Sequence, residues 1–404
     1  MPTLSSLLRG RWALLSRLWA RLRVRATRAG SRWLLGARAG DLAYSGLRSI
    51  EEVSGREFMV PHLIRIDTLH PPRTVRYAFD APALPRYFRQ HKAFAAELGY
   101  ELQDVCVAPA SGLAWLPEAP YVLLESIGCL QRLAGWADLV PELLQRPTSL
   151  PEPGPVIVCP VGPFYHWLFE MLPAVLLARQ WHPEARLLLP ATTPAYVEQA
   201  LRRALPAEDW DRLVLRAAGA VRVPHLLLIA RDDMSGFVRP EALRLLRRTF
   251  VPDPAPAYRH VYISRRHTAN RAAAREEALE AGLRERGFEV VYAERLSFEE
   301  QIALLREART LVGLHGAGLS HLVWATGPLT VAEIFPDGVF NDCYARLTVS
   351  LGFDYQPYFC GTAQQHDQPG PLPVADILGW LDGWWRPATP VKAGISTPLS
   401  IATP

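Results

Sequence analysis

Short apolar runs alternate with helical patterns along most of the chain, and a proline-rich stretch divides the alternation into two halves. The helical patterns have apolar residues three and four positions apart, which places them on one helix face. Before the proline-rich stretch, we predict strands over 121–126, 155–162, 185–191 and 225–230, and helices over 165–180, 193–205 and 240–248. After it, we predict strands over 260–265, 288–293, 310–315, 329–335 and 353–359, and helices over 274–286, 298–309, 317–325 and 341–351.

This alternation is typical of an α/β protein whose parallel sheets are covered by helices on both faces. The stretch 251–258 contains three prolines and no periodicity, so we predict that it links an α/β domain over 41–250 to a second one over 259–362. Residues 363–404 predict a helix over 374–385 and a tail. We expect that helix to pack back across the join between the two domains.

Residues 1–40 combine an apolar helical stripe with many arginines. The stripe recurs at steps of three and four and is formed by Leu4, Leu8, Trp12, Leu15, Trp19 and Leu22. Because arginines interrupt every apolar run, we expect neither a signal peptide nor a bilayer-spanning helix. The pattern predicts a basic amphipathic helix. The segment either lies on an anionic membrane surface through residues 1–25, docks on its own domain, or forms a partly ordered arm.

The basic residues are unevenly distributed along the chain. Residues 1–40 hold nine arginines and no acidic residue, so the 44 basic and 40 acidic residues of the whole chain leave 35 basic and 40 acidic ones beyond them, a net charge of −5. An acidic main body argues against nucleic acid as a partner. The five cysteines are scattered without a metal-binding spacing, and we expect reduced thiols in a cytoplasmic protein.

The most informative stretch is 313–325, GLHGAGLSHLVWA, where a predicted strand ends and a helix begins. In open α/β sheets, ligands bind beyond the carboxyl ends of the strands and often at helix N-termini. The turn Gly316-Ala317-Gly318 would let a phosphate approach the backbone N–H groups, and His315 can donate a hydrogen bond to it. Alternatively, the glycines only allow tight packing of the strand against the helix.

Three further charged residues lie near the ends of predicted strands. Arg265 and Arg266 follow the first strand after the linker. Arginine binds phosphate oxygens with paired hydrogen bonds, although adjacent surface arginines are common in a chain so rich in arginine. Glu333 lies within the apolar run 329–335, where an acid can accept hydrogen bonds from ribose hydroxyls or cap the next loop.

His166 and Glu170 are four residues apart at the start of a predicted helix, so they share one helix face. A histidine held by a carboxylate can act as a general base toward a hydroxyl, and the same pair can also be purely structural.

Two common nucleotide-binding motifs are missing from the expected places. Neither half has a GxGxxG motif after its first strand, which disfavours a nicotinamide enzyme, and GxxxxGK[ST] does not occur, which disfavours a P-loop kinase. The acidic pair at 209 and 211 lies in a polar turn, and we expect no metal there.

Taken in order, these stretches resemble glycosyltransferase family 61, whose bacterial members are often described as capsular polysaccharide biosynthesis proteins. The matching stretches are 164–173, 262–266, 287–325 and 330–336. One position departs from the family pattern, because Arg275-Glu276 stands where the family usually has an Asn-Glu pair.

The resemblance implies a GT-B-like fold, in which two facing Rossmann-like domains hold a nucleotide-sugar donor on the C-terminal side and a glycan or lipid-linked glycan acceptor on the other. His166 and Glu170 would face the cleft as the catalytic pair. The implied reaction is inverting, uses no cofactor and no metal, and takes place in the cytoplasm at the inner membrane face. The residues assigned to the donor are Arg265, Arg266, Glu276, His315, Gly316, Ala317, Gly318 and Glu333, with Glu333 at the ribose.

Two other functions fit the same patterns. A non-catalytic relative would bind a glycan or a nucleotide without turnover. A nucleotide-sugar epimerase would change the donor in the absence of any acceptor.

Overall fold

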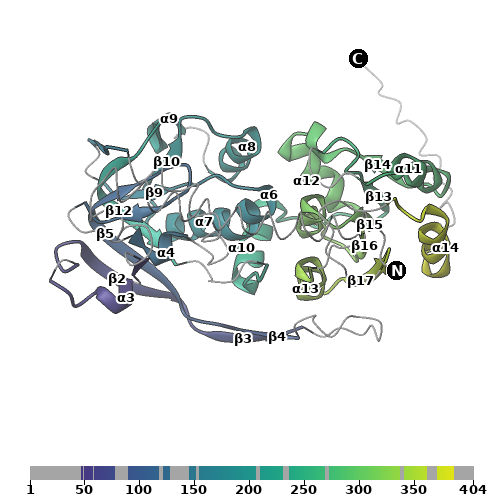
Figure 1. Ribbon diagram of the computed structural model, residues 1–404, viewed down its shortest axis with the longest axis horizontal. Coiled ribbons are helices and arrows are strands. Elements are labelled where there is room, and N and C mark those ends of the chain that lie inside the picture. Colours follow the sequence, from purple (N-terminus) through teal and green to yellow (C-terminus); the bar gives the residue numbers. More distant parts are fainter. Residues whose placement is uncertain are drawn as a thin grey trace, which may run out of the picture.

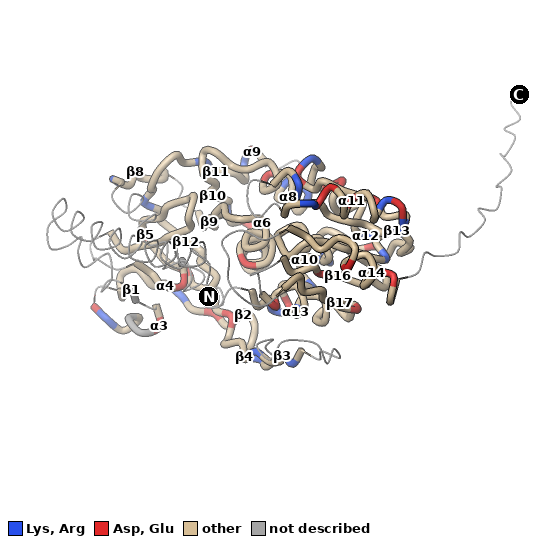
Figure 2. The backbone as a smooth tube through the Cα atoms, turned by 45° about the vertical axis from the view of Figure 1, so that its right-hand side comes forward, with Lys and Arg blue, Asp and Glu red and all other residues tan. Residues whose placement is uncertain are grey.

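The computed structural model shows two lobes side by side, the first built before the linker and the second after it (Figure 1). The predicted amphipathic segment 1–40 lies outside the described residues, so its membrane contact stays a prediction. Basic and acidic residues are interspersed over both lobes (Figure 2). The structure describes residues 47–48, 50–57, 59–77, 90–117, 122–127, 145–151, 154–205, 210–230, 236–268, 273–336, 341–361 and 371–385.

The first lobe is built on a ten-stranded mixed sheet. Part of this sheet is parallel as predicted, in the order β12-β9-β10-β11, and the pairs β8–β12 and β1–β7 are parallel as well. Strand β12 pairs antiparallel with the long strand β5, and β5 pairs antiparallel with β2 and β6, so the prediction of a wholly parallel sheet is wrong here. The strands are β1 (Leu47–Arg48), β2 (Leu63–His70), β5 (Glu97–Val107), β6 (Ala114–Trp115), β7 (Val122–Leu123), β8 (Thr148–Ser149), β9 (Val156–Val158), β10 (Arg186–Pro190), β11 (Val214–Ala217) and β12 (Val221–Ile229).

A separate antiparallel ribbon, β3 (Arg73–Arg76) with β4 (His91–Phe94), runs along the lower side of the first lobe (Figure 1). Helices cover the main sheet. The predicted strand over 121–126 is only β7, which passes directly into helix α4. The helical elements are α3 (Ile50–Val53), α4 (Leu124–Ile127), α6 (Phe164–His166), the π-helix η2 (Trp167–Met171), α7 (Leu172–Trp181), α8 (Ala195–Ala204), α9 (Trp210–Leu213) and α10 (Pro240–Phe250).

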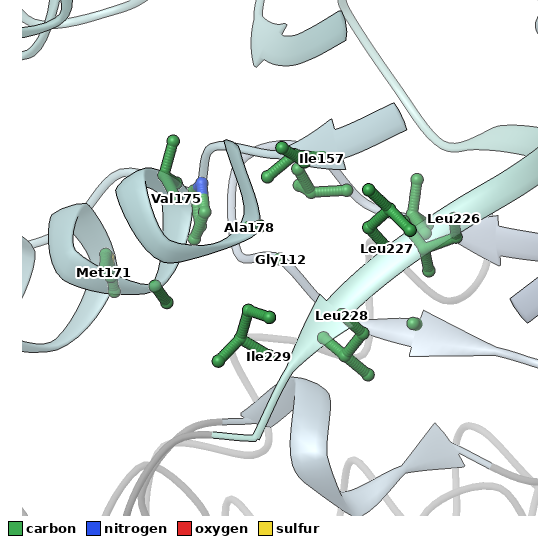
Figure 3. A pocket seen from close by; sticks show the side chains of 14 residues that line it. Gly112, Ile157, Met171, Val175, Ala178, Leu226, Leu227, Leu228 and Ile229 are labelled. Carbon is green, nitrogen blue, oxygen red and sulfur yellow. The ribbon is translucent and has the colours of Figure 1, made fainter. Parts of the chain in front are cut away.

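A small cavity of about 40 Å³ lies between β12 and α7 in this lobe. Its lining is formed by apolar side chains such as Ile157, Val175 and Leu227 (Figure 3). Because its lining side chains are apolar and the space is small, we interpret it as a packing feature of the core.

The second lobe is a five-stranded parallel sheet in the order β14-β13-β15-β16-β17, as the alternation predicts. Its strands are β13 (Arg259–Ile263), β14 (Glu289–Val291), β15 (Ala308–Leu314), β16 (Thr330–Phe335) and β17 (Asp354–Phe359). Its helices are α11 (Glu276–Glu285), the 3₁₀-helix η4 (Ala293–Arg295), α12 (Phe298–Arg306), the 3₁₀-helix η5 (Ala317–Trp324), α13 (Cys343–Ser350) and α14 (Val374–Trp384). The capping box of Ser297 and Glu300 starts α12.

Helix α14 packs on the outer side of the second lobe, away from the first (Figure 1). Arg286, which directly follows α11, forms an ion pair with Asp382 of α14 at 2.6 Å, and Leu283, Ile377 and Leu381 share one apolar cluster. The expectation that this helix crosses the join between the lobes is therefore wrong. Tryptophans and leucines on its apolar face cover the second sheet instead.

One apolar core runs through both lobes. Phe250 of α10 packs edge-on against Phe298 and Trp324 of the second lobe, with 5.4 Å between the ring centroids in each case. Arg247, also on α10, donates hydrogen bonds to the carbonyls of Val323 and Ala325 at 2.9 and 2.5 Å. The linker 251–258 contains no helix or strand. Because the apolar core continues from one lobe into the other, it does not mark a boundary at the linker. The predicted domain boundaries therefore remain predictions.

The residue before helix α11 occupies the left-handed region of backbone conformation. Arg275 has φ = 71°, which asparagine adopts more readily than arginine. We expect Arg275→Asn to raise the free energy of unfolding by about 0.5–1 kcal/mol, measured by urea denaturation. Arg275→Ala is the matched control, because it removes the same side chain without favouring this conformation. An equal gain for both variants would refute the backbone explanation.

Candidate active site

The strand order of the second lobe indicates where a ligand would bind. In a doubly wound sheet, the crevice opens where the strand order reverses, beyond the carboxyl ends of the first and third strands. These are β13 and β15, which pair in register with Ile263 opposite Gly313. The residues that follow them, Ser264–Arg265 and His315–Gly318, therefore meet at one edge of the sheet.

The spacing of the two glycines is explained by close contacts at this edge. A Cβ atom on Gly316 would lie 1.4 Å from Nη1 of Arg265, so the guanidinium packs directly on the glycine. A Cβ atom on Gly318 would lie 2.6 Å from Cγ2 of Ile263, inside the strand–helix packing. Gly316 has φ = 161°, an extended conformation open to any residue, so the requirement there is purely steric. The packing alternative is therefore confirmed for Gly318, whereas the approach of a phosphate to the turn stays a prediction.

His315 is held by a buried hydrogen-bond chain. Its Nδ1 lies 2.5 Å from Oε1 of Glu333, and the hydroxyl of Tyr355 donates to Oε2 of Glu333 at 2.5 Å. Burial and the nearby Glu333 carboxylate raise the pKa of Tyr355 well above its usual value, so this hydroxyl keeps its proton. The ring of His315 also stacks on Phe335, with centroids 5.5 Å apart. A carboxylate at Nδ1 fixes the orientation of the ring and leaves Nε2 as the nitrogen that can meet a ligand.

This geometry gives Glu333 a different role from the predicted ribose contact. Its side chain is fully buried, and both of its carboxylate oxygens accept hydrogen bonds from the protein. Because the carboxylate has no exposed area, a ribose hydroxyl could not reach it without a rearrangement of the surrounding side chains. Glu333 is therefore a positioning residue for His315 in this structure.

A pocket of about 510 Å³ opens beside the same edge and is walled by both lobes. Of the residues assigned to the donor, Arg265, Ala317 and Gly318 line it from the second lobe, and the others, Arg266, Glu276, His315, Gly316 and Glu333, do not. Phe164 and Tyr196 line it from the first lobe. Its volume is within the range usual for small-molecule sites. The remaining lining residues are Ala195, Gln199, Ile263, Ser264, Thr268, Ala293, Glu294, Leu296, Gln301 and His321.

Residues 164–332 match the family model of glycosyltransferase 61. The matched segment begins at Phe164 and includes the strand ends, the glycine turn and the residues that wall the pocket. It covers the later part of the first lobe and most of the second, which are the parts joined by the common core.

A known glycosyltransferase is also similar to part of the chain. The EGF domain-specific O-linked N-acetylglucosamine transferase of Drosophila melanogaster is 33% identical over 129 residues, which is 31% of this chain. The similarity spans only 24% of that enzyme's length. Together, the family match and this relative support a glycosyltransferase, without identifying the substrate.

Arg265 and Arg266 both lie in the segment that matches the family model, but they occupy different environments. Arg265 lines the pocket, whereas Arg266 is exposed and forms ion pairs with Glu277 and Glu280 at 3.2 and 3.6 Å. Arg266 is not among the lining residues of the pocket. Of the predicted pair, the structure brings only Arg265 to the candidate site.

Glu276 lies behind the pocket. Its Oε1 accepts hydrogen bonds from the Arg265 backbone N–H at 2.7 Å and from the Tyr262 hydroxyl at 2.9 Å. Burial raises the pKa of Glu276, and its side chain has almost no exposed area. We therefore interpret Glu276 as the residue that holds the loop after β13, instead of the direct donor contact that the resemblance implied.

His166 and Glu170 do form the predicted pair. Nδ1 of His166 lies 2.9 Å from Oε1 of Glu170, and the His166 side chain is 39% exposed. Glu170 belongs to the π-helical turn η2, and such turns within helices are frequent at functional sites. His166 is not among the pocket-lining residues, although Phe164, two residues earlier, is. Its role as the catalytic base stays a prediction.

Sequence reasoning missed several pocket residues. His321 follows Gly318 by three residues, the repeat of a 3₁₀-helix, so both stand on the same side of η5. Gln301 donates hydrogen bonds from Nε2 to the carbonyls of Ala293 and Leu296 at 2.8 and 3.1 Å and thereby shapes the adjacent turn. The spacing in the sequence could have identified His321. Nothing local indicated that Tyr196 reaches the second lobe's pocket.

Among the described residues, no three His, Cys, Asp or Glu side chains form a group that could hold a metal ion. Asp209, one member of the acidic pair, lies outside these residues, so the expectation of no metal stays untested. No helix in the described part of the chain has the length and apolar character needed to cross a membrane.

Proposed function

We propose that this protein is an inverting, metal-independent glycosyltransferase with a GT-B-like arrangement of two facing lobes. It would transfer a sugar from a nucleotide-sugar donor to a glycan or lipid-linked glycan in surface polysaccharide biosynthesis. The observation that carries the proposal is the pocket of about 510 Å³ at the ends of β13 and β15, walled by Arg265, Ala317 and Gly318. The family match supports glycosyltransferase activity in general.

In this proposal, the second lobe neutralises the departing diphosphate. Arg265 supplies a fixed positive charge, and the backbone N–H groups of the Gly316–Gly318 turn supply further donors. His315, oriented by Glu333, does not line the pocket but directly precedes the turn, and in this proposal its Nε2 donates a hydrogen bond to the same group. The acceptor hydroxyl is deprotonated from the first lobe, where His166 is held by Glu170 at 2.9 Å. An inverting transfer needs these two functions on opposite sides of the sugar.

The proposal is tested by a binding screen against UDP-, GDP-, dTDP- and CMP-sugars, with and without EDTA. UDP-N-acetylglucosamine is the first donor to try, because the name of the Drosophila relative specifies N-acetylglucosamine transfer. We expect one nucleotide sugar to raise the melting temperature of the protein, and we expect EDTA not to abolish the shift. A folded protein that responds to none of them would overturn the proposal.

The adjacent arginines provide a matched pair of variants for this screen. Arg265→Ala is expected to remove the ligand-induced shift, because it removes the cation that lines the pocket. Arg266→Ala is expected to retain the shift, because Arg266 is exposed and does not line the pocket. Equal loss in both variants would indicate a general electrostatic effect and contradict the assigned site.

Product analysis distinguishes transfer from the two alternative functions. A transferase consumes the nucleotide sugar and lengthens an added glycan or lipid-linked glycan. An epimerase changes the nucleotide sugar without an acceptor, and a non-catalytic relative leaves it unchanged under all conditions.

A cytoplasmic location with residues 1–25 at the inner membrane face belongs to the same proposal. Co-sedimentation of the protein with anionic vesicles tests the membrane contact.

A further inference from the structure

His321 is a buried histidine of the pocket whose chemistry the proposed reaction does not yet use. It lies on η5, three residues after Gly318, and both residues line the pocket. Its ring packs against Phe164 of the first lobe, with the centroids 5.0 Å apart. The ring is therefore held from both lobes at the wall of the pocket.

The imidazole of His321 has an unused polar atom. The residue is only 2% exposed, and Nδ1 has no hydrogen-bond partner among the described residues. A buried polar atom without a partner carries a desolvation cost that most folded proteins avoid. In a pocket wall, a ligand that supplies the missing hydrogen bond would remove this cost.

The charge state of His321 indicates the kind of group it would bind. Burial lowers the pKa of this histidine to about 4, so the ring is neutral at pH 7. A neutral imidazole offers one hydrogen-bond donor and one acceptor, which suits a hydroxyl or an amide. The positive charge for a diphosphate comes instead from Arg265, which lines the same pocket.

The neighbours of His321 indicate which part of the donor it meets. Phe164, on which it packs, begins the same helical segment that carries His166 and Glu170. The transferred sugar must lie between the diphosphate and the acceptor base, and this is the side on which His321 lies. The turn held by Gln301 is a separate part of the pocket lining, and we assign it to the nucleoside of the donor.

We propose that His321 hydrogen-bonds an uncharged hydroxyl or amide group of the transferred sugar and so contributes to the choice of donor. This inference rests on the proposed function. It predicts that His321 distinguishes a nucleotide sugar from the nucleotide diphosphate alone, which has the same base, ribose and phosphates.

The test is a calorimetric titration of UDP and of UDP-N-acetylglucosamine into the full chain. His321→Phe keeps a flat ring against Phe164 but has no hydrogen-bonding atom. We expect it to weaken binding of the nucleotide sugar by about tenfold and to change UDP binding by less than about twofold. His321→Asn, which retains a donor and an acceptor, is expected to lose less affinity for the nucleotide sugar than His321→Phe.

His267→Phe is the matched control, because this exposed histidine has an aromatic neighbour, Tyr292, at 4.8 Å and does not line the pocket. It should bind both ligands as the wild type does. Equal losses for UDP and the nucleotide sugar in His321→Phe, or no loss for either, would overturn the assignment of His321 alone. If the wild-type protein bound no nucleotide of the panel, the proposed function would fail and this inference with it.

Discussion

His166→Ala is expected to slow sugar transfer by about 10²- to 10⁴-fold, the usual contribution of a general base, while donor affinity stays unchanged. The reason is that His166 belongs to the first lobe and does not line the pocket proposed for the donor. Its imidazole is paired at Nδ1 with Glu170, so the ring is oriented before any acceptor arrives. Rates measured with saturating donor and acceptor, together with donor titrations, separate the two effects.

Glu170→Gln is the companion variant. Glutamine can still hydrogen-bond the His166 ring but cannot stabilise its positive charge after proton transfer. We therefore expect a smaller loss of rate than for His166→Ala, again with donor affinity retained. His91→Ala, on the β3–β4 ribbon, is the control and should leave transfer unchanged. Wild-type turnover in His166→Ala would exclude this histidine as the base.

The second lobe could be predicted closely from the sequence, because its strands are buried on both faces. Such strands appear as continuous apolar runs, and Thr330–Phe335 is an example with five of its six residues buried. The start of α12 was equally clear, since Ser297 and Glu300 form a local capping box whose geometry depends on no distant residue. Where local signals specify an element, prediction from sequence succeeded.

The first lobe's sheet could not be predicted in the same way. Its central contact is the antiparallel pairing of β5 with β12, strands more than a hundred residues apart in the chain. Which strands pair, and in which register, depends on how their buried faces pack in three dimensions. The sequence of one strand does not identify its partner. Of the strands predicted in this lobe, those from β12 to β11 have the parallel arrangement inferred from alternation.

The candidate site shows the same division between local and distant information. The glycine turn was recognisable because glycine is unfavourable in a core unless something approaches closely. That Glu333 serves His315, and not a ribose, depends on a hydrogen bond across two neighbouring strands and on Tyr355 from a third. Likewise, the contact between His321 and Phe164 joins the two lobes and has no signature within either segment.

Gly316→Ala is expected to weaken UDP binding by about 10- to 100-fold, the range for losing charge-assisted hydrogen bonds, with little change in the free energy of unfolding. The new methyl group would occupy the position where Nη1 of Arg265 now lies, 1.4 Å away. Because that atom is the end of a flexible side chain, the guanidinium can move at little cost to the fold. It would then no longer stand in the pocket.

Two comparisons make this prediction specific. Gly318→Ala should instead lower the free energy of unfolding, because its Cβ atom would meet Ile263 within the strand–helix packing at 2.6 Å. In an Arg265→Ala background, Gly316→Ala should cause no further loss of UDP affinity, since the side chain it displaces is already absent. Additive losses in the double variant would mean that Gly316 acts by another route, such as direct approach of the phosphate to its backbone. The double variant therefore decides whether this glycine serves the arginine or the ligand itself.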